Sequence, residues 1–139
     1  MTPLYSAAIL TPRGRKDLLE WWETFVGPTL DTVIAHHMTI QFKPIVLESF
    51  PAQIQGVDLG RVTTLKIVGY KDDGKAQAVV VEGVNSSNTI AHVTVSVATG
   101  VKPVYSNTML AQGYQRVNGP TIDVKVGFVG KDNRDYYSL

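Results

Sequence analysis

A four-residue pattern occurs twice in the chain, and its residue types could carry out acid–base chemistry. It reads His-Met-Thr-Ile over residues 37–40 and His-Val-Thr-Val over residues 92–95. In a β-strand, residues i and i+2 lie on the same face. Each copy therefore places a histidine and a threonine on one face and two apolar side chains on the other. If the two strands lie side by side, two imidazoles and two hydroxyls converge on one site.

Such a group could cleave a phosphodiester without a metal ion. A neutral imidazole takes the proton from the attacking hydroxyl, and a protonated imidazole gives one to the leaving oxygen; the unperturbed histidine pKa of about 6.5 suits both tasks. The hydroxyls of Thr39 and Thr94 could bind the nonbridging phosphate oxygens, where charge develops in the transition state. The predicted catalytic residues are therefore His37, Thr39, His92 and Thr94. The pattern does not say which histidine is the base.

The alternatives to this interpretation are weaker. One His-x-Thr on a strand carries little information, but two of the chain's three histidines lie in the two copies. Neither copy contains Asp or Glu, and the adjacent His36 and His37 would face opposite sides of a strand, so we expect no metal. His36 is expected at the surface or behind the site. A Gly-x-Ser-x-Gly motif and a Gly-rich phosphate loop are both missing from the sequence, and there is no cysteine nucleophile.

The surrounding sequence predicts an α+β fold that positions the two copies. Apolar alternation and turn residues predict strands, and one-sided apolar spacing predicts helices. The expected strands span 4–10, 33–42, 62–70, 76–84, 89–98 and 116–129 (one or two strands), and the expected helices span 15–25 and 107–112. We expect Ser106 to cap the second helix, residues 71–75 to form a hairpin turn, and residues 44–60 to form a loop. Nothing marks a domain boundary, so a single domain over 1–139 is expected.

Composition narrows the class of ligand. The formal net charge of +1 argues against binding to duplex nucleic acid, which needs a strongly basic surface, and is compatible with a small anionic ligand. The apolar runs are shorter than the roughly 20 residues of a membrane helix. The N-terminal residues lack a positively charged signal-peptide region, and cysteine is absent, so we expect a cytoplasmic location. The sequence does not predict the oligomeric state.

The paired motif resembles the signature of the two-histidine (2H) phosphoesterase superfamily. The longer strings over 34–40 (Ile-Ala-His-His-Met-Thr-Ile) and 91–95 (Ala-His-Val-Thr-Val) resemble the branch of phage anti-CBASS nucleases, which destroy the cyclic oligonucleotide signals of bacterial immunity. The stretches 5–10 and 102–107 are similar to related RNA-repair domains. The resemblance implies a bilobal fold with two antiparallel sheets around a central cleft and outer helices. It also implies metal-independent attack on a 3′–5′ or 2′,3′-cyclic phosphodiester, without a cofactor.

Substrate-binding residues are predicted from aromatic and basic side chains near the motifs. A nucleotide base gains about 1–3 kcal/mol from stacking on an aromatic ring. Tyr5, on the first strand, is the first candidate, with core packing as the alternative. Lys102 could meet a phosphate, and Tyr105 could stack or anchor a loop. Trp22 is expected in the core, Trp21 is expected to be partly exposed, and the tail residues Tyr136 and Tyr137 could cover the cleft.

These observations lead to one main functional hypothesis and two alternatives. The main hypothesis is a phosphodiesterase that hydrolyses cyclic oligonucleotides such as cyclic GMP–AMP. The nearest alternative is a 2′,3′-cyclic phosphodiesterase of RNA end repair, which uses the same chemistry on another substrate. The third is a binding protein that sequesters a nucleotide without cutting it. The intact histidines of both motifs argue against this third class, because sequestration needs no acid–base pair.

Overall fold

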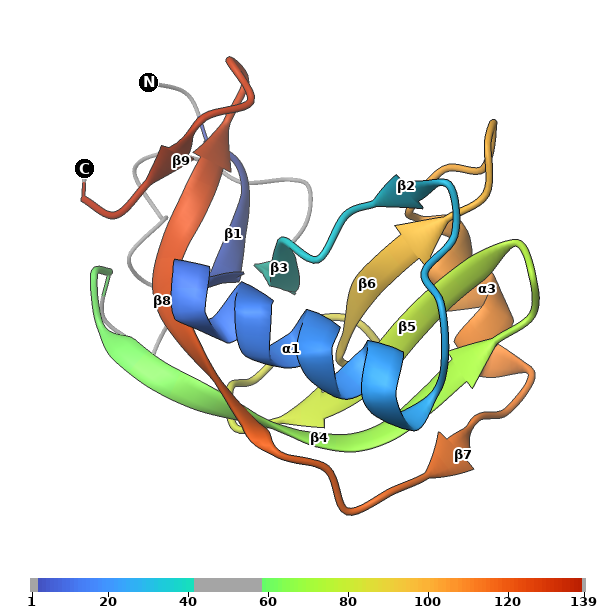
Figure 1. Ribbon diagram of the computed structural model, residues 1–139. Helices are drawn as coiled ribbons and strands as arrows, with labels where there is room; N and C mark the ends of the chain where they lie inside the picture. Colours follow the sequence, from blue (N-terminus) through green and yellow to red (C-terminus); the bar gives the residue numbers. More distant parts are fainter. Residues whose placement is uncertain (1–2, 42–58, 139) are drawn as a thin grey trace.

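The computed structural model describes residues 3–41 and 59–138, so most of the loop predicted over 44–60 lies outside the described residues (Figure 1). Within these ranges no helix is long and apolar enough to cross a bilayer. The elements in chain order are β1 (Pro3–Leu10), α1 (Pro12–Phe25), β2 (Thr32–Val33), β3 (His37–Gln41), β4 (Val62–Asp72), β5 (Ala76–Glu82), β6 (His92–Val97), α3 (Tyr105–Ala111), β7 (Gln115–Arg116), β8 (Thr121–Gly130) and β9 (Asp135–Tyr136).

The described strands form one antiparallel sheet, which confirms the α+β class. The strand order is β7-β4-β5-β6-β3-β1-β8-β9, and β2 pairs with β6. Strand β4 also pairs with β8, so the pairings from β4 through β5, β6, β3, β1 and β8 return to β4 and form a closed ring. Figure 1 shows β1, β8 and β9 in one half, and β5, β6 and α3 in the other. The two halves are parts of one continuous sheet, because β3 pairs with β6 and β4 pairs with both β5 and β8. The family resemblance, by contrast, implies two separate sheets.

The two motif strands are neighbours, which is the condition under which their histidines and threonines converge. Strands β3 and β6 pair in antiparallel register with Met38 opposite Val93, and both side chains are fully buried. Moving one residue along each strand in opposite directions sets His37 opposite Thr94 and Thr39 opposite His92. The histidines and threonines alternate with the two buried side chains, so all four lie on the other face of the sheet.

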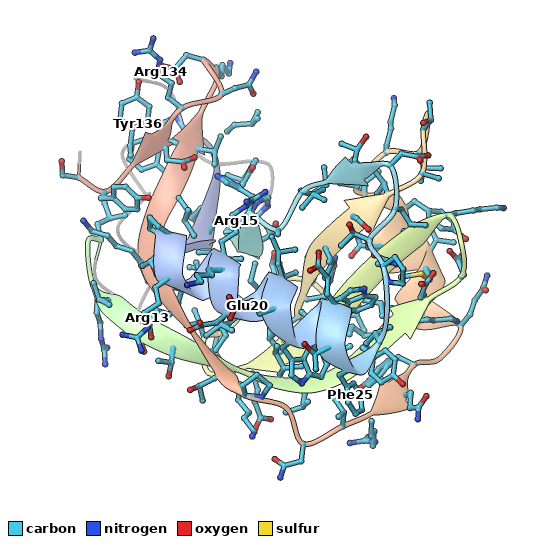
Figure 2. All side chains as sticks on the ribbon, in the orientation of Figure 1. Arg13, Arg15, Glu20, Phe25, Arg134 and Tyr136 are labelled. Atoms are coloured by element: carbon cyan, nitrogen blue, oxygen red, sulfur yellow. The ribbon has the colours of Figure 1, made fainter. Side chains whose placement is uncertain are left out.

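Helix α1 covers the apolar face of this sheet. Leu18 and Trp22 are fully buried and share one core cluster with Met38 and Val93. The charged side chains of α1, such as those of Arg13 and Glu20 in Figure 2, are exposed. Trp22 is therefore a core residue as expected, and Trp21 is partly buried, packing against Phe25 and Tyr70. The helix starts earlier than predicted because Pro12 fits its first turn and the Thr11 hydroxyl accepts the Gly14 N–H.

The strand predicted over 33–42 is interrupted at Ala35. This residue has φ of 39°, in the left-handed region that L-residues rarely adopt. The break separates β2 from β3, and the backbone N–H groups of Ile34 and Ala35 donate to carbonyls of β6. On its other side, the carbonyl of His36 accepts the Leu10 N–H. The interrupted segment thus remains bonded to both neighbouring strands.

Helix α3 packs on β5 through a second apolar cluster, which includes Ala76, Ala78, Met109 and Leu110. The prediction that Ser106 caps this helix is wrong. The helix begins at Tyr105 because the carbonyls of Lys102 and Pro103 accept the first backbone N–H groups. Ser106 instead lies in the first turn, fully buried. The second helix therefore presents Ser106 to the sheet.

Replacing Gly14 by Ala should destabilise the fold by about 1–3 kcal/mol. A β-carbon at Gly14 would lie 2.0 Å from the carbonyl oxygen of Asp123, so α1 must move away from β8. This cost opposes the helix-propensity gain of about 1 kcal/mol that Ala would otherwise bring. Urea unfolding measures the change, with Arg13→Ala on the exposed neighbour as the control. A Gly14→Ala variant more stable than the wild type would contradict this close helix–strand contact.

Candidate active site

All four predicted catalytic residues line one cavity of about 260 Å³. Strands β3 and β6 supply the histidines and threonines, β1 supplies Tyr5, and the segment before α3 supplies an apolar wall. The lining residues are Tyr5, Ile34, His37, Thr39, Asn88, His92, Thr94, Pro103, Val104 and Asn107. The antiparallel register of the motif strands thus brings both imidazoles and both hydroxyls to one hollow, on the sheet face that α1 does not cover.

Of the three predicted substrate-binding residues, the structure brings only Tyr5 to the cavity. Its ring stacks on the imidazole of His37 with the ring centroids 4.8 Å apart. Burial, with a smaller effect of the Asp135 charge, raises the pKa of Tyr5 to about 12. Tyr5 therefore stays neutral and supports one face of the His37 ring.

Lys102 and Tyr105 do not line the cavity. The Tyr105 hydroxyl donates to the carboxylate of Asp73 in the β4–β5 turn, and the Lys75 ammonium lies 5.8 Å from the centre of the Tyr105 ring. Tyr105 therefore anchors the start of α3 to this turn, which is the loop-anchoring alternative of the sequence analysis. The backbone carbonyl of Lys102 accepts the Tyr105 N–H.

The tail aromatics do not line the cavity either. Tyr136 stacks on Phe128, with centroids 5.2 Å apart, and the Lys125 ammonium lies over the ring of Tyr137. The cavity wall instead includes the amides of Asn88, in a loop, and Asn107, in the first turn of α3, together with the exposed Val104. Val104 and Asn107 lie in the stretch 102–107, whose similarity to RNA-repair domains is the available sequence signal, whereas no motif or spacing marks Asn88.

His37 is held from behind by its neighbour in sequence. The Nδ1 atoms of His36 and His37 are 2.8 Å apart, and the Nε2 atom of His36 lies 3.0 Å from each carboxylate oxygen of Asp135. The break at Ala35 allows this contact, since consecutive residues of a regular strand would face opposite sides. With Nδ1 engaged, Nε2 is the ring nitrogen of His37 left for a ligand.

His92 is held in a parallel way by the backbone. Its Nδ1 lies 2.8 Å from the carbonyl oxygen of Ile90, which can only accept, so Nδ1 carries the proton. His92 is buried, with 8% of its surface exposed. Nε2 is thus also the ring nitrogen of His92 left for a ligand, and each motif histidine uses Nδ1 for support.

Burial keeps both motif histidines neutral. Desolvation lowers the pKa of His37 to about 3, and the nearby His36 and His92 add to the shift. Desolvation also lowers the pKa of His92, against the opposing effect of the Ile90 carbonyl. An anionic phosphate in the cavity would favour the protonated form of a histidine and raise its pKa. Binding of such an anion would therefore be coupled to protonation at this site.

The two threonines differ in their surroundings. The Thr94 hydroxyl lies 2.9 Å from the hydroxyl of the buried Ser106, so α3 orients it. The Thr39 carbonyl accepts a hydrogen bond from Ser86, while its hydroxyl has no hydrogen bond to the described part of the chain. Over residues 3–41 and 59–138, no three His, Asp or Glu side chains gather as metal ligands would. The two motifs thus bring two imidazoles and two hydroxyls to the cavity, and Asn88 and Asn107 add two amides.

The sequence profile of the fungal tRNA ligase phosphodiesterase domain matches residues 57–130, just over half of the chain. The chain belongs to this family. These phosphodiesterases are of the two-histidine type, so membership in the 2H superfamily is confirmed. The match includes His92 and Thr94 of the second motif, and the first motif lies before it. No curated protein sequence matches this chain.

The buried neutral histidines should make this phosphodiesterase-family domain less stable as pH falls. Below about pH 6.5 His37 and His92 become protonated in the unfolded chain but stay neutral in the folded protein, because their folded pKa values are lowered. The free energy of unfolding therefore decreases as the pH falls. One such histidine contributes up to about 1.4 kcal/mol per pH unit. Urea unfolding between pH 7 and pH 5 should show this loss, and His37→Gln should flatten it. An unchanged slope in His37→Gln would contradict a neutral, buried His37.

Proposed function

We propose that this domain is a metal-independent phosphodiesterase that hydrolyses cyclic phosphodiesters of ribonucleotides. One observation carries the proposal: two imidazoles, each supported through Nδ1, line the same cavity as two threonine hydroxyls. General acid–base catalysis of phosphoryl transfer needs such a pair near the phosphorus. Membership in a phosphodiesterase family supports the reaction class.

The reaction proceeds by in-line displacement at phosphorus. One histidine takes the proton of the attacking hydroxyl through its Nε2, the new P–O bond forms, and the bond to the leaving oxygen breaks. The other histidine gives its Nε2 proton to that oxygen. The hydroxyls of Thr39 and Thr94 donate to the nonbridging oxygens as their charge grows. A second displacement by water reverses the two proton transfers and restores the enzyme.

The favoured substrate is a cyclic oligonucleotide second messenger with 3′–5′ linkages. The net charge of +1 suits a small anion better than a long RNA, and Val104, Pro103 and Ile34 give the cavity an apolar wall. The flanking sequence of both motifs, which resembles phage anti-CBASS nucleases, adds support. In this setting a ligand 2′-hydroxyl attacks the neighbouring phosphorus, in the cytoplasm of an infected bacterium.

The second candidate is opening of a 2′,3′-cyclic phosphate at an RNA end. The match to the fungal tRNA ligase phosphodiesterase domain favours it. The two candidates are chemically continuous, because attack by a 2′-hydroxyl on a 3′–5′ linkage leaves a 2′,3′-cyclic phosphate. Water then opens this ring in the same cavity. A single site could thus act on both, at different rates.

The substrates can be separated by turnover in EDTA. We expect cyclic GMP–AMP to be cleaved at a rate that EDTA does not change, and a short RNA ending in a 2′,3′-cyclic phosphate to be opened more slowly. Chromatography of the products measures both. Faster opening of the RNA end would assign the domain to RNA repair. Turnover of neither substrate, or loss of turnover in EDTA, would overturn the proposed function.

The catalytic groups can be tested by truncation. His37→Ala and His92→Ala should each lower kcat by orders of magnitude. Thr39→Val should raise the activation free energy by up to about 2.7–4 kcal/mol, the effect of removing one hydrogen-bond donor from an oxyanion site. Thr99→Val is the matched control, because Thr99 bonds Asp31 outside the cavity and should leave kcat unchanged. If the protein instead sequesters the nucleotide without cutting it, the His37→Ala variant should still lower the concentration of free nucleotide.

The pH–rate profile should reveal the coupling between ligand and proton. In the free enzyme the pKa of His92 is lowered below the usual histidine value of about 6.5. If His92 is the acid, kcat/KM should therefore fall as the pH rises through this lowered pKa. Bound phosphate raises this pKa, and the alkaline limb of kcat should lie at higher pH than that of kcat/KM. Limbs that coincide would contradict the coupling.

A further inference from the structure

We propose that Asp135 and His36 are a positioning pair that orients His37 as the general base, which leaves His92 as the general acid. This assignment rests on the proposed function and deepens it. The pair lies outside both motifs: His36 precedes β3, and Asp135 begins β9. A continuous chain of short contacts runs from the Asp135 carboxylate through both ring nitrogens of His36 to Nδ1 of His37.

In the proposed arrangement each ring of this chain carries one proton. The Asp135 carboxylate only accepts, so Nε2 of His36 carries a proton. A neutral His36 then has a lone pair on Nδ1 and accepts the Nδ1–H of His37. His37, itself neutral, is left with a lone pair on Nε2. That nitrogen is ready to take a proton from an attacking hydroxyl.

His92 has a different partner and therefore a different aptitude. Burial lowers the pKa of His92, but its Nδ1–H donates to the Ile90 carbonyl, and this bond acts in the opposite direction, toward the imidazolium whose Nε2–H can be given away. Among the described residues His37 has no such carbonyl partner: around it lie Tyr5 from β1, His92 from β6 and His36. The two histidines therefore differ in the direction in which each transfers its first proton.

The fold brings Asp135 to His36 by a close approach at Gly127. A β-carbon there would lie 2.3 Å from the Tyr136 carbonyl oxygen, so the absence of a side chain lets β9 lie close to β8. Asn133, with φ of 63°, lies in the turn between these strands, a conformation that Asn tolerates. Asp135 of β9 then pairs with Val129 of β8, and Val129 in turn pairs with Tyr5 of β1.

Orientation, more than stability, is what this pair provides. The side chains of His36 and Asp135 are 36% and 32% exposed, and a polar side-chain pair in contact with water contributes little to the free energy of unfolding. A hydrogen bond to the ring nitrogen that faces away from the ligand selects the histidine tautomer, and this affects the reaction rate more than the free energy of unfolding. Losing a partner of this kind behind a metal ligand costs about 10–100-fold in activity, and more in a serine protease triad.

The first test compares Asp135 with Asp132, an aspartate in the turn that precedes β9. Asp135→Asn should lower kcat at least tenfold with KM within twofold, because an amide can donate as well as accept and no longer selects the His36 tautomer. Asp132→Asn is the matched control: Asp132 binds the Arg134 N–H and the Tyr136 hydroxyl but does not contact His36. Equal losses in the two variants would show a structural effect of the turn and overturn the proposal.

The second test compares two replacements of His36. His36→Asn retains an amide oxygen that can accept the His37 Nδ1–H, and His36→Ala does not. His36→Asn should therefore keep several-fold more activity, although both variants lose the contact with Asp135. Equal activities would contradict orientation through a hydrogen bond.

The third test reads the tautomer directly, without substrate. Nitrogen-15 NMR of the three histidines should show His37 protonated at Nδ1 in the wild type and in Asp132→Asn, and a mixture of tautomers in Asp135→Asn. An unchanged His37 tautomer in Asp135→Asn overturns the proposal, whatever the activity, and so does a changed tautomer with an unchanged kcat. If the wild type cleaves no substrate, the proposed function fails, and the NMR result still decides whether the pair orients His37.

Discussion

One backbone pairing, Met38 with Val93, holds the site together. These two buried residues form the register point between β3 and β6, and every motif side chain takes its place from it. Because antiparallel strands run in opposite directions, the pairing sets each histidine across from the threonine of the other copy. A shift of either strand by one residue would turn the histidine and the threonine of that strand into the apolar core. The burial of Met38 and Val93 beneath α1 opposes such a shift, so core packing specifies the geometry of the site.

The sequence was sufficient to predict the parts of the molecule that have strong local patterns. Alternation identified β1, β4, β5 and β6, and the one-sided apolar spacing identified α1, with Trp22 in the core. The doubled His-x-Thr predicted which four side chains meet, because strand periodicity fixes their common face. What the pattern lacks is strand order, and nothing local distinguishes one continuous sheet from two.

The remaining features depend on contacts between distant segments. Ser106 has the residue type of a helix cap, but its burial against Thr94 follows from how α3 packs on β5. The break at Ala35 has no sequence signal, since Gly or Asn is the usual residue at positive φ. Without that break, His36 would face away from His37. Asp135 is one of two aspartates in the polar stretch 131–139, and only the β8–β9 pairing shows that it reaches His36.

The position of Asp135 also has a consequence for the order in which the protein is made. Asp135 lies 99 residues after His36, and β9 can pair only after β8 has formed. During synthesis both motifs therefore leave the ribosome well before the carboxylate that supports His37. A nascent or C-terminally trimmed chain can contain both His-x-Thr motifs and still lack this support. The presence of the two motifs in a fragment is thus a poor guide to whether that fragment is active.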